Sequence, residues 1–394
     1  MSENADDVTQ SRFSGYVWLV VPLLLMGLAI AWIIAADPLK GLNRSAPPVE
    51  NLTYERTVLD EAGLHLLVRA GGSEPMRIAQ VQVDDAYWQF TQRPAGPIAR
   101  GSTAWIDIPF PWMLGEAHFV VAVTHTGAAF DHEIPVALPT PKATWDQLVP
   151  QALVGIIVGI LPVSLGLMCY PALRNAGRDL MNFLLALTIG LLAFLFVDTL
   201  LEALEFSGES AALFQGPMMV VMAAALSFLA LMAVGRRSGA PTGLALSTFI
   251  AIGIGLHNLG EGLAIGAAYA AGAAGLGSFL VIGFAVHNIT EGIGIVAPVL
   301  KSRPSIASLA VLALIAGGPA VIGMWLGSLA YAPHWSALAL GIGAGAILQV
   351  IIEVGAYLKR TAGTGESGLF TPSILAGFLI GASFMYVTAA FVKV

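Results

Sequence analysis

The chain has 394 residues, of which 57% are hydrophobic and only 11% are charged, and its mean hydropathy is +0.79. This composition is outside the usual range of soluble domains and indicates a membrane protein. A net charge of −7 without a basic run excludes nucleic-acid binding, because phosphate contacts need clustered Lys and Arg. The single cysteine, Cys169, excludes a disulfide framework and a cysteine-based metal site within one chain.

The N-terminal region combines a polar tail, residues 1–15, with an apolar stretch, residues 16–36. The stretch is close to the ~20 residues that a transmembrane helix needs. It is long for the apolar core of a signal peptide, and the tail before it is acidic rather than basic. We therefore expect a retained membrane anchor that follows a cytoplasmic tail.

Residues 37–148 have a different composition, in which Pro, Asp, Gln and Thr return and apolar residues alternate with polar ones. Turn residues separate five candidate strands, which are 64–68, 78–83, 104–108, 119–124 and 133–137. Short strands at this spacing predict a small antiparallel β-sandwich, similar to immunoglobulin-like domains in pattern only.

Eight apolar segments follow in residues 149–394, and each is long enough to cross a bilayer. They are 149–169, 180–205, 213–235, 243–270, 276–299, 306–330, 336–358 and 372–392. We expect helices, because backbone polar groups in lipid must be satisfied within the segment. The predicted fold is a polytopic α-helical membrane protein, with an eight-helix bundle after one anchor helix and a small β-sandwich.

Basic residues occur in every second loop of this bundle and predict its orientation. They are Arg174 and Arg178, Arg236 and Arg237, Lys301 and Arg303, and Lys359 and Arg360. The positive-inside rule makes these four loops cytoplasmic. The β-sandwich and the C-terminus are then extracytoplasmic, and the expected location is a bacterial cytoplasmic (inner) membrane.

Several acidic residues lie inside the predicted membrane segments, and no Lys or Arg lies there with them. These acids are Asp198, Glu202, Glu261, Glu291 and Glu353. An unpaired carboxylate at the bilayer centre costs roughly 3 kcal/mol on insertion scales, so such residues normally face a polar interior and mark an ion or proton path.

A repeated motif points to metal as the missing cation. The fourth segment reads His-Asn-Leu-Gly-Glu-Gly at 257–262, and the fifth reads His-Asn-Ile-Thr-Glu-Gly at 287–292. Each His shares a helix face with the Glu four residues later. Two such faces supply an N/O ligand set for Zn²⁺, and also for Fe²⁺, Mn²⁺, Co²⁺, Ni²⁺ or Cd²⁺. The predicted ligands are His257, Asn258, Glu261, His287, Asn288 and Glu291.

Both motifs fall near mid-membrane on successive, oppositely directed helices, as in inverted-repeat transporters with central sites. We expect Gly262 and Gly292 to remove side chains where these two helices approach each other. The remaining polar residues predict an entry and exit path on either side of the centre. Asp198 and Glu202 lie on its outer half, and Gln349 and Glu353 on its inner half.

In these motifs residues 148–394 resemble the ZIP (Zrt/Irt-like) family of divalent-metal transporters, which have eight spanning helices and paired HNxxEG-type motifs in helices four and five. Residues 197–203 look like the family's HLLPEA segment, with Asp198 in the His place. Residues 345–353 look like the family stretch that ends in an acidic residue near the inner exit. The resemblance implies passage of Zn²⁺, Fe²⁺ or related ions toward the cytosol, and a homodimer.

This sequence also departs from the family pattern at three positions. Gly260 and Thr290 stand where the family usually has Pro, so we expect a weaker helix kink or none. Ala320 stands where many members have Glu, so we expect one ion to be held firmly and a second only poorly.

The expected function is transmembrane transport of divalent cations, with Zn²⁺ ranked first and the metal as the transported substrate rather than a cofactor. Two alternatives stay open. One is an intramembrane metalloenzyme, which the absence of an HExxH pattern disfavours. The other is a metal-responsive membrane receptor, whose β-sandwich would recognise a partner that the sequence does not identify.

Overall fold

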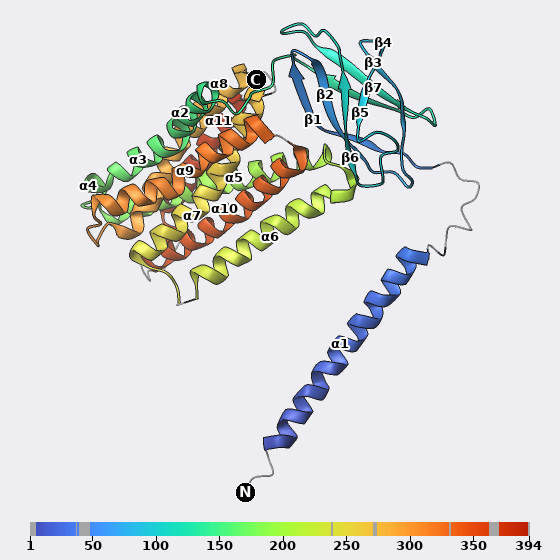
Figure 1. Ribbon diagram of the computed structural model, residues 1–394. Coiled ribbons are helices and arrows are strands. Elements are labelled where there is room, and N and C mark those ends of the chain that lie inside the picture. Colours follow the sequence, from blue (N-terminus) through green and yellow to red (C-terminus); the bar gives the residue numbers. More distant parts are fainter. Residues whose placement is uncertain are drawn as a thin grey trace. The chain divides into compact units, whose positions relative to one another are not determined.

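The computed structural model of the protein describes residues 5–36, 38, 48–237, 239–270, 274–330, 332–361 and 370–392 (Figure 1). The chain divides into two compact units, residues 1–49 and residues 50–394. The first unit contains one helix. The second contains two β-sheets and the remaining helices.

Helix α1 (Ala5–Ala36) contains the predicted anchor and begins within the predicted tail, so the tail is helical from Ala5 onward. Large apolar side chains of its second half, such as Leu24 and Leu25, are exposed. An exposed apolar surface of this kind suits a helix surrounded by lipid. The anchoring role stays a prediction.

Residues 52–134 form two four-stranded antiparallel sheets, as the β-sandwich prediction required. The first sheet has the order β1 (Leu52–Asp60), β2 (Gly63–Ala70), β6 (Thr103–Ile108) and β5 (Thr91–Arg93). The second has the order β4 (Ala86–Trp88), β3 (Ile78–Val83), β7 (His118–Thr124) and β8 (Ala129–Ile134). Leu66 and Ile106 of the first sheet share one buried cluster with Val81 and Val120 of the second.

Four of the five predicted strands match β2, β3, β6 and β7, whereas the last prediction, 133–137, overlaps β8 only at Glu133 and Ile134. The observed β8 ends before Pro135, whose missing N–H cannot continue a ladder. Strand β1 was not predicted, because a charged residue, Glu55, interrupts its apolar pattern. Glu55 is buried and its carboxylate pairs with the guanidinium of Arg69 on β2.

His65 of β2 lies between two carboxylates of the sandwich. Its Nδ1 is 2.6 Å from Oδ1 of Asp107, and its Nε2 is 3.1 Å from Oδ1 of Asp60. Burial lowers the pKa of His65, but the hydrogen bonds to the two carboxylates outweigh burial and hold that pKa above its usual value. For His132, by contrast, burial dominates and lowers the pKa.

We therefore expect His65 to keep its proton to a higher pH than His132, measured by histidine-selective NMR titration of the intact protein. A raised folded-state pKa adds stability below the unfolded value of about 6.5, and this stability is lost as the pH rises through the folded value. His65→Ala should lower the melting temperature more at pH 5.5 than at pH 9. Equal losses at both pH values would contradict this linkage.

Eight helical segments in the described residues are long and apolar enough to cross a membrane, as predicted. The first consists of α2 (Trp145–Gly155), the π-helix η1 (Ile156–Ile160), α3 (Leu161–Met168) and α4 (Tyr170–Leu173). The others are α5 (Arg178–Gly208), α6 (Gly216–Gly235) after the short η2 (Ala212–Phe214), α7 (Gly243–Ala270), α8 (Ala274–Val296) with η3 (Ala297–Val299), α9 (Ile306–Ala330), α10 (Pro333–Thr361) and α11 (Pro372–Val392).

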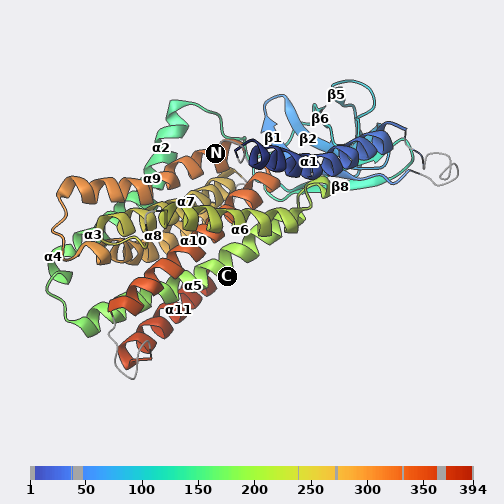
Figure 2. The ribbon, with the colours of Figure 1, turned by 90° about the horizontal axis from the view of Figure 1, so that it is seen from below.

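The helices that carry the predicted site occupy the middle of the bundle. Figure 2 shows α7, α8 and α10 between α9 on one side and α5 with α11 on the other. Buried side chains from most of these helices, among them Leu192, Ile254, Ile295 and Val350, form one continuous apolar core. Polar residues on α7, α8 and α10 are therefore held in a largely apolar surrounding.

Three of the four basic loops meet at one end of the bundle. The guanidinium of Arg178, at the start of α5, donates to the carbonyl of Thr361 at the end of α10 at 2.9 Å. The guanidinium of Arg360 donates to the carbonyl of Pro241, in the loop between α6 and α7, at 3.4 Å. Three of the four loops used for the orientation prediction are thus linked by hydrogen bonds at the same end.

Candidate metal centre

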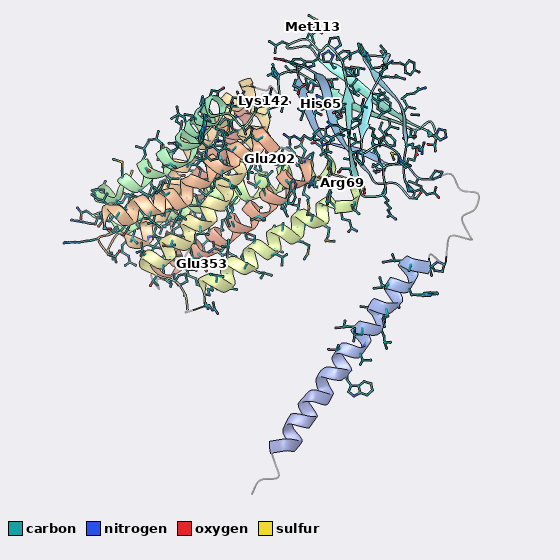
Figure 3. All side chains as sticks on the ribbon, viewed as in Figure 1. His65, Arg69, Met113, Lys142, Glu202 and Glu353 are labelled. Atoms are coloured by element: carbon teal, nitrogen blue, oxygen red, sulfur yellow. The ribbon has the colours of Figure 1, made fainter. Side chains whose placement is uncertain are left out.

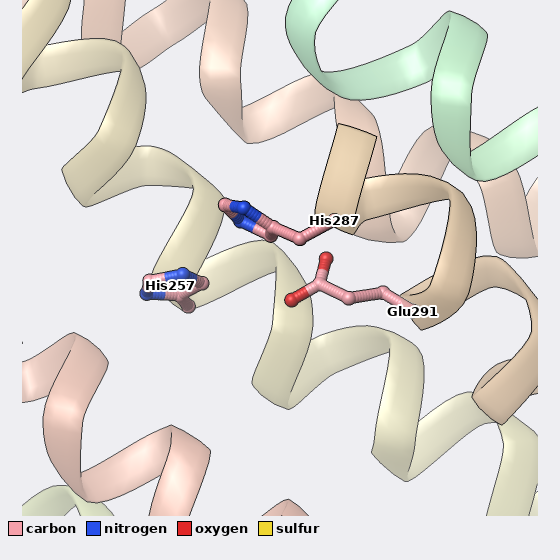
Figure 4. Close-up of side chains that lie close together, drawn as sticks. All are labelled: His257, His287 and Glu291. Atoms are coloured by element: carbon pink, nitrogen blue, oxygen red, sulfur yellow. The ribbon is translucent and has the colours of Figure 1, made fainter. Parts of the chain in front are cut away.

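Helices α7 and α8 bring the two motifs together at one buried point. His257 of α7 and both His287 and Glu291 of α8 point toward one another (Figure 4). One donor atom of each residue lies within 4.8 Å of a donor atom of the other two. All three residues are buried, with His257 3% exposed and His287 and Glu291 each 2% exposed. Among the described residues, no other group of three His, Cys, Asp or Glu side chains meets this distance.

Glu261, predicted as a ligand beside His257, accepts hydrogen bonds from the second motif and lies close to the imidazole of the first. Its Oε1 lies 2.7 Å from Nε2 of His287 and 3.2 Å from Nε2 of His257. Its Oε2 accepts a bond from the amide of Asn288 at 3.0 Å. The carboxylate of α7 therefore orients one imidazole and one amide of α8.

This geometry offers donor atoms to a divalent metal ion. Each histidine can contribute one ring nitrogen, Nδ1 or Nε2, to such an ion. Ligand atoms of a tetrahedral zinc site lie about 3.3 Å apart, given bonds of about 2.0 Å. The spacing between His257 and Glu261 is close to that value. Both carboxylate oxygens of Glu291 have no hydrogen-bond partner among the described residues, which leaves them available as ligands.

The two motif asparagines are fastened to backbone carbonyls of neighbouring helices. Asn258 donates to Ala316 of α9 and Asn288 donates to Val158 of η1, each at 3.0 Å. Pro162 explains the second contact, because it has no N–H to offer the carbonyl of Val158 four residues earlier. The Oδ1 atoms of both asparagines lack a partner in the described part of the chain, so their amide oxygens can accept further contacts.

We expect Asn288→Ala to destabilise the protein by about 2 kcal/mol, because it leaves the carbonyl of Val158 and one oxygen of Glu261 buried without this donor. The measurement is thermal unfolding in detergent. The matched control is Thr248→Ala, since among the described residues the hydroxyl of Thr248 donates only to the carbonyl of Leu244 on its own helix. A loss no larger than that of the control would contradict the fastening role of Asn288.

The prediction for the motif glycines was wrong in its choice of neighbours. A β-carbon at Gly262 would lie 2.1 Å from the carbonyl oxygen of Ala320, so this glycine allows contact with α9. A β-carbon at Gly292 would lie 2.3 Å from the carbonyl oxygen of Val163, so this glycine allows contact with α3. Each motif helix therefore packs backbone to backbone against a different outer helix, which fixes the orientation of its His and Glu.

The structure describes the surroundings of the three positions that depart from the ZIP pattern, which are Gly260, Thr290 and Ala320. Helices α7 and α8 are unbroken through Gly260 and Thr290, as expected without proline. Ala320 is fully buried, and a β-carbon at Gly159 would lie 2.8 Å from the β-carbon of Ala320. Position 320 therefore supplies no acidic ligand, and the expectation of one firmly held ion stays a prediction.

The predicted path residues lie outside the central cluster. Asp198 and Glu202 are partly buried in α5, and Figure 3 places Glu202 and Glu353 toward opposite ends of the bundle. Gln349 and Glu353 are each 1% exposed and lie one turn apart on α10. The entry and exit role of these residues stays a prediction.

The expectation that no basic residue accompanies the buried acids was wrong for Glu353. Nε of Arg236 lies 2.9 Å from Oε1 of Glu353. Sequence reasoning assigned Arg236 to a loop, yet it directly follows the apolar residues of α6. This position at the end of an apolar helix could have predicted the ion pair, because a long Arg side chain there can reach a carboxylate on a neighbouring helix.

A comparison with protein-family models and with curated proteins finds no match to this chain. The conclusions on function therefore depend on the sequence motifs and on the geometry of the centre.

Proposed function

We propose that the protein transports divalent metal ions across a membrane in the manner of the ZIP family. The observation that carries this proposal is the buried convergence of His257, His287 and Glu291 from two helices that are both long and apolar enough to span. Ionisable groups at such a depth are costly unless a counter-charge accompanies them. A divalent cation supplies that charge and uses all three donors.

The donor set favours borderline and harder metals. Two imidazole nitrogens with carboxylate and amide oxygens suit Zn²⁺ first, and Fe²⁺, Mn²⁺ or Cd²⁺ after it. Thiolate ligands, which would favour softer ions, do not enter, because the one cysteine lies on the first spanning segment at Cys169. We propose one firmly bound ion for each chain.

The arrangement of the polar residues favours transport over catalysis. Gln349 and Glu353 continue from the centre along α10, where an enzyme would have no use for a series of buried polar groups. The four basic loops support placing the Arg236 end in the cytosol and the other end outside. Inward movement of the ion, a bacterial inner membrane and a homodimer are further parts of the proposal, and they derive from the ZIP resemblance.

The test is metal binding by the purified protein together with uptake into sealed proteoliposomes. We expect one Zn²⁺ bound per chain and saturable Zn²⁺ uptake that Fe²⁺, Mn²⁺ and Cd²⁺ compete for with different strengths. Protein-free vesicles give the background rate. Metal binding with background uptake would favour the metalloenzyme or receptor alternative, and absence of both binding and uptake would reject a metal function.

A further inference from the structure

A second buried polar group lies at the end of α10 that bears the basic loops. Glu353 is 1% exposed, and its carboxylate pairs through Oε1 with Arg236, whose side chain is 45% exposed. The other carboxylate oxygen, Oε2, has no hydrogen-bond partner in the described part of the chain. The pair therefore joins a buried anion to a cation at the bundle surface.

One turn before Glu353, Gln349 extends this polar group toward the metal centre. Neither amide atom of Gln349 has a partner among the described residues, although its side chain is almost completely buried. A β-carbon at Gly253 would lie 3.1 Å from its Oε1, so Gln349 faces α7 one turn before His257. An amide with no partner in so buried a place is an available ligand for a passing cation.

The positions along α10 form a series that starts at the centre. Gly343 packs against His257, since a β-carbon at this glycine would lie 3.5 Å from the α-carbon of His257. From Gly343, Gln349 is about 9 Å and Glu353 about 15 Å further along the helix axis. The series ends where Glu353 pairs with Arg236 of α6, whose side chain is exposed at the bundle surface.

Arg236 is held in place by its backbone. It caps the C-terminus of α6, and its N–H bonds to the carbonyls of Met232 and Val234. Its guanidinium therefore reaches Glu353 from a fixed point on a neighbouring helix. A buried carboxylate requires a cation nearby, and the guanidinium fills that requirement while no metal ion is there.

We propose that Arg236 is a tethered cation that closes the exit end of the path, and that a divalent ion leaves by displacing its guanidinium from Glu353. In the closed state the guanidinium neutralises the carboxylate and obstructs access to Gln349. When a metal ion reaches Gln349 and Glu353, its charge replaces that of the guanidinium, which turns to solvent. This inference depends on the proposed transport function, but its test does not measure transport.

The test is the reaction rate of a thiol placed inside the closed end. Cys169 is the single cysteine, so Cys169→Ser supplies a cysteine-free background for Gln349→Cys. We expect a membrane-impermeant maleimide to label this thiol about tenfold faster after Arg236→Gln. The matched control is Arg237→Gln, which removes an equal charge from the next, exposed residue and should leave the rate unchanged.

The reagent is applied separately to right-side-out and inverted vesicles, and a thiol from Ser302→Cys in an exposed basic loop identifies the accessible face. Acceleration should occur only from the face that labels this thiol. Equal rates for Arg236→Gln and Arg237→Gln would overturn the proposal. If labelling accelerates while the otherwise wild-type protein transports no metal, the tethered cation stands and the transport function fails.

A second variant covers the case in which Arg236→Gln does not fold. Glu353→Gln keeps the size of the buried side chain and removes its need for a cation, so the guanidinium is released without leaving a buried charge. We expect the same accelerated labelling of the thiol from Gln349→Cys. A rate equal to that of the Cys169→Ser parent with Gln349→Cys would overturn the proposal without reference to Arg236→Gln.

Discussion

Glu291→Gln is expected to reduce Zn²⁺ uptake by about 100-fold or more while the protein stays folded. The substitution removes a carboxylate from a cluster whose other members are His257 and His287, and loss of a supporting group alone typically costs 10–100-fold in metal affinity. The fold should persist, because both oxygens of Glu291 lack hydrogen-bond partners in the described structure and glutamine has nearly the same shape.

The measurement is initial-rate uptake in proteoliposomes together with the Zn²⁺ dissociation constant of the purified variant. The control is Glu205→Gln, which neutralises an exposed carboxylate on α5 and should change neither quantity appreciably. If Glu291→Gln kept wild-type uptake and affinity, the ion would not be held where the two motifs meet.

Gly262→Ala is expected to have the largest effect on stability, about 2–3 kcal/mol, because its β-carbon would lie 2.1 Å from the carbonyl oxygen of Ala320. A backbone oxygen cannot rotate away as a side chain can, so α7 and α9 must separate. This separation moves Glu261, the preceding residue, and should weaken zinc binding as well as lower the melting temperature.

The matched control for this prediction is Gly318→Ala, two residues before Ala320 on α9. A β-carbon at Gly318 meets no atom within 4 Å, so the substitution should leave stability unchanged or raise it by up to about 1 kcal/mol through helix propensity. Similar melting temperatures for the two variants would show that close approach of α7 and α9 does not govern the geometry of the centre.

The apolar segments and the doubled motif could be predicted from the sequence because each depends on neighbours along the chain. Runs of apolar residues identify spanning helices by length, and the spacing from His257 to Glu261 identifies a shared helix face. The alternating apolar residues of β2, β3, β6 and β7 identify buried strands in the same way.

Contacts between distant segments could not be predicted. The sequence places Gly262 on a face of α7 but does not indicate whether α8 or α9 lies against it. Asn288 reaches Val158, 130 residues away, and Arg236 reaches Glu353, 117 residues away. In β1 the ion pair of Glu55 with Arg69 conceals the strand, because local patterning treats each charge as solvent-exposed.

The most direct test of the metal centre is zinc K-edge X-ray absorption of the zinc-loaded protein, with metal content measured on the same sample. We expect one zinc per chain, with two imidazole nitrogens and carboxylate oxygens at about 2.0–2.2 Å. Replacing His257 and His287 together with alanine should remove both the imidazole signal and the bound metal. A first shell without imidazole, or a shell unchanged in that double variant, would contradict a metal centre between α7 and α8.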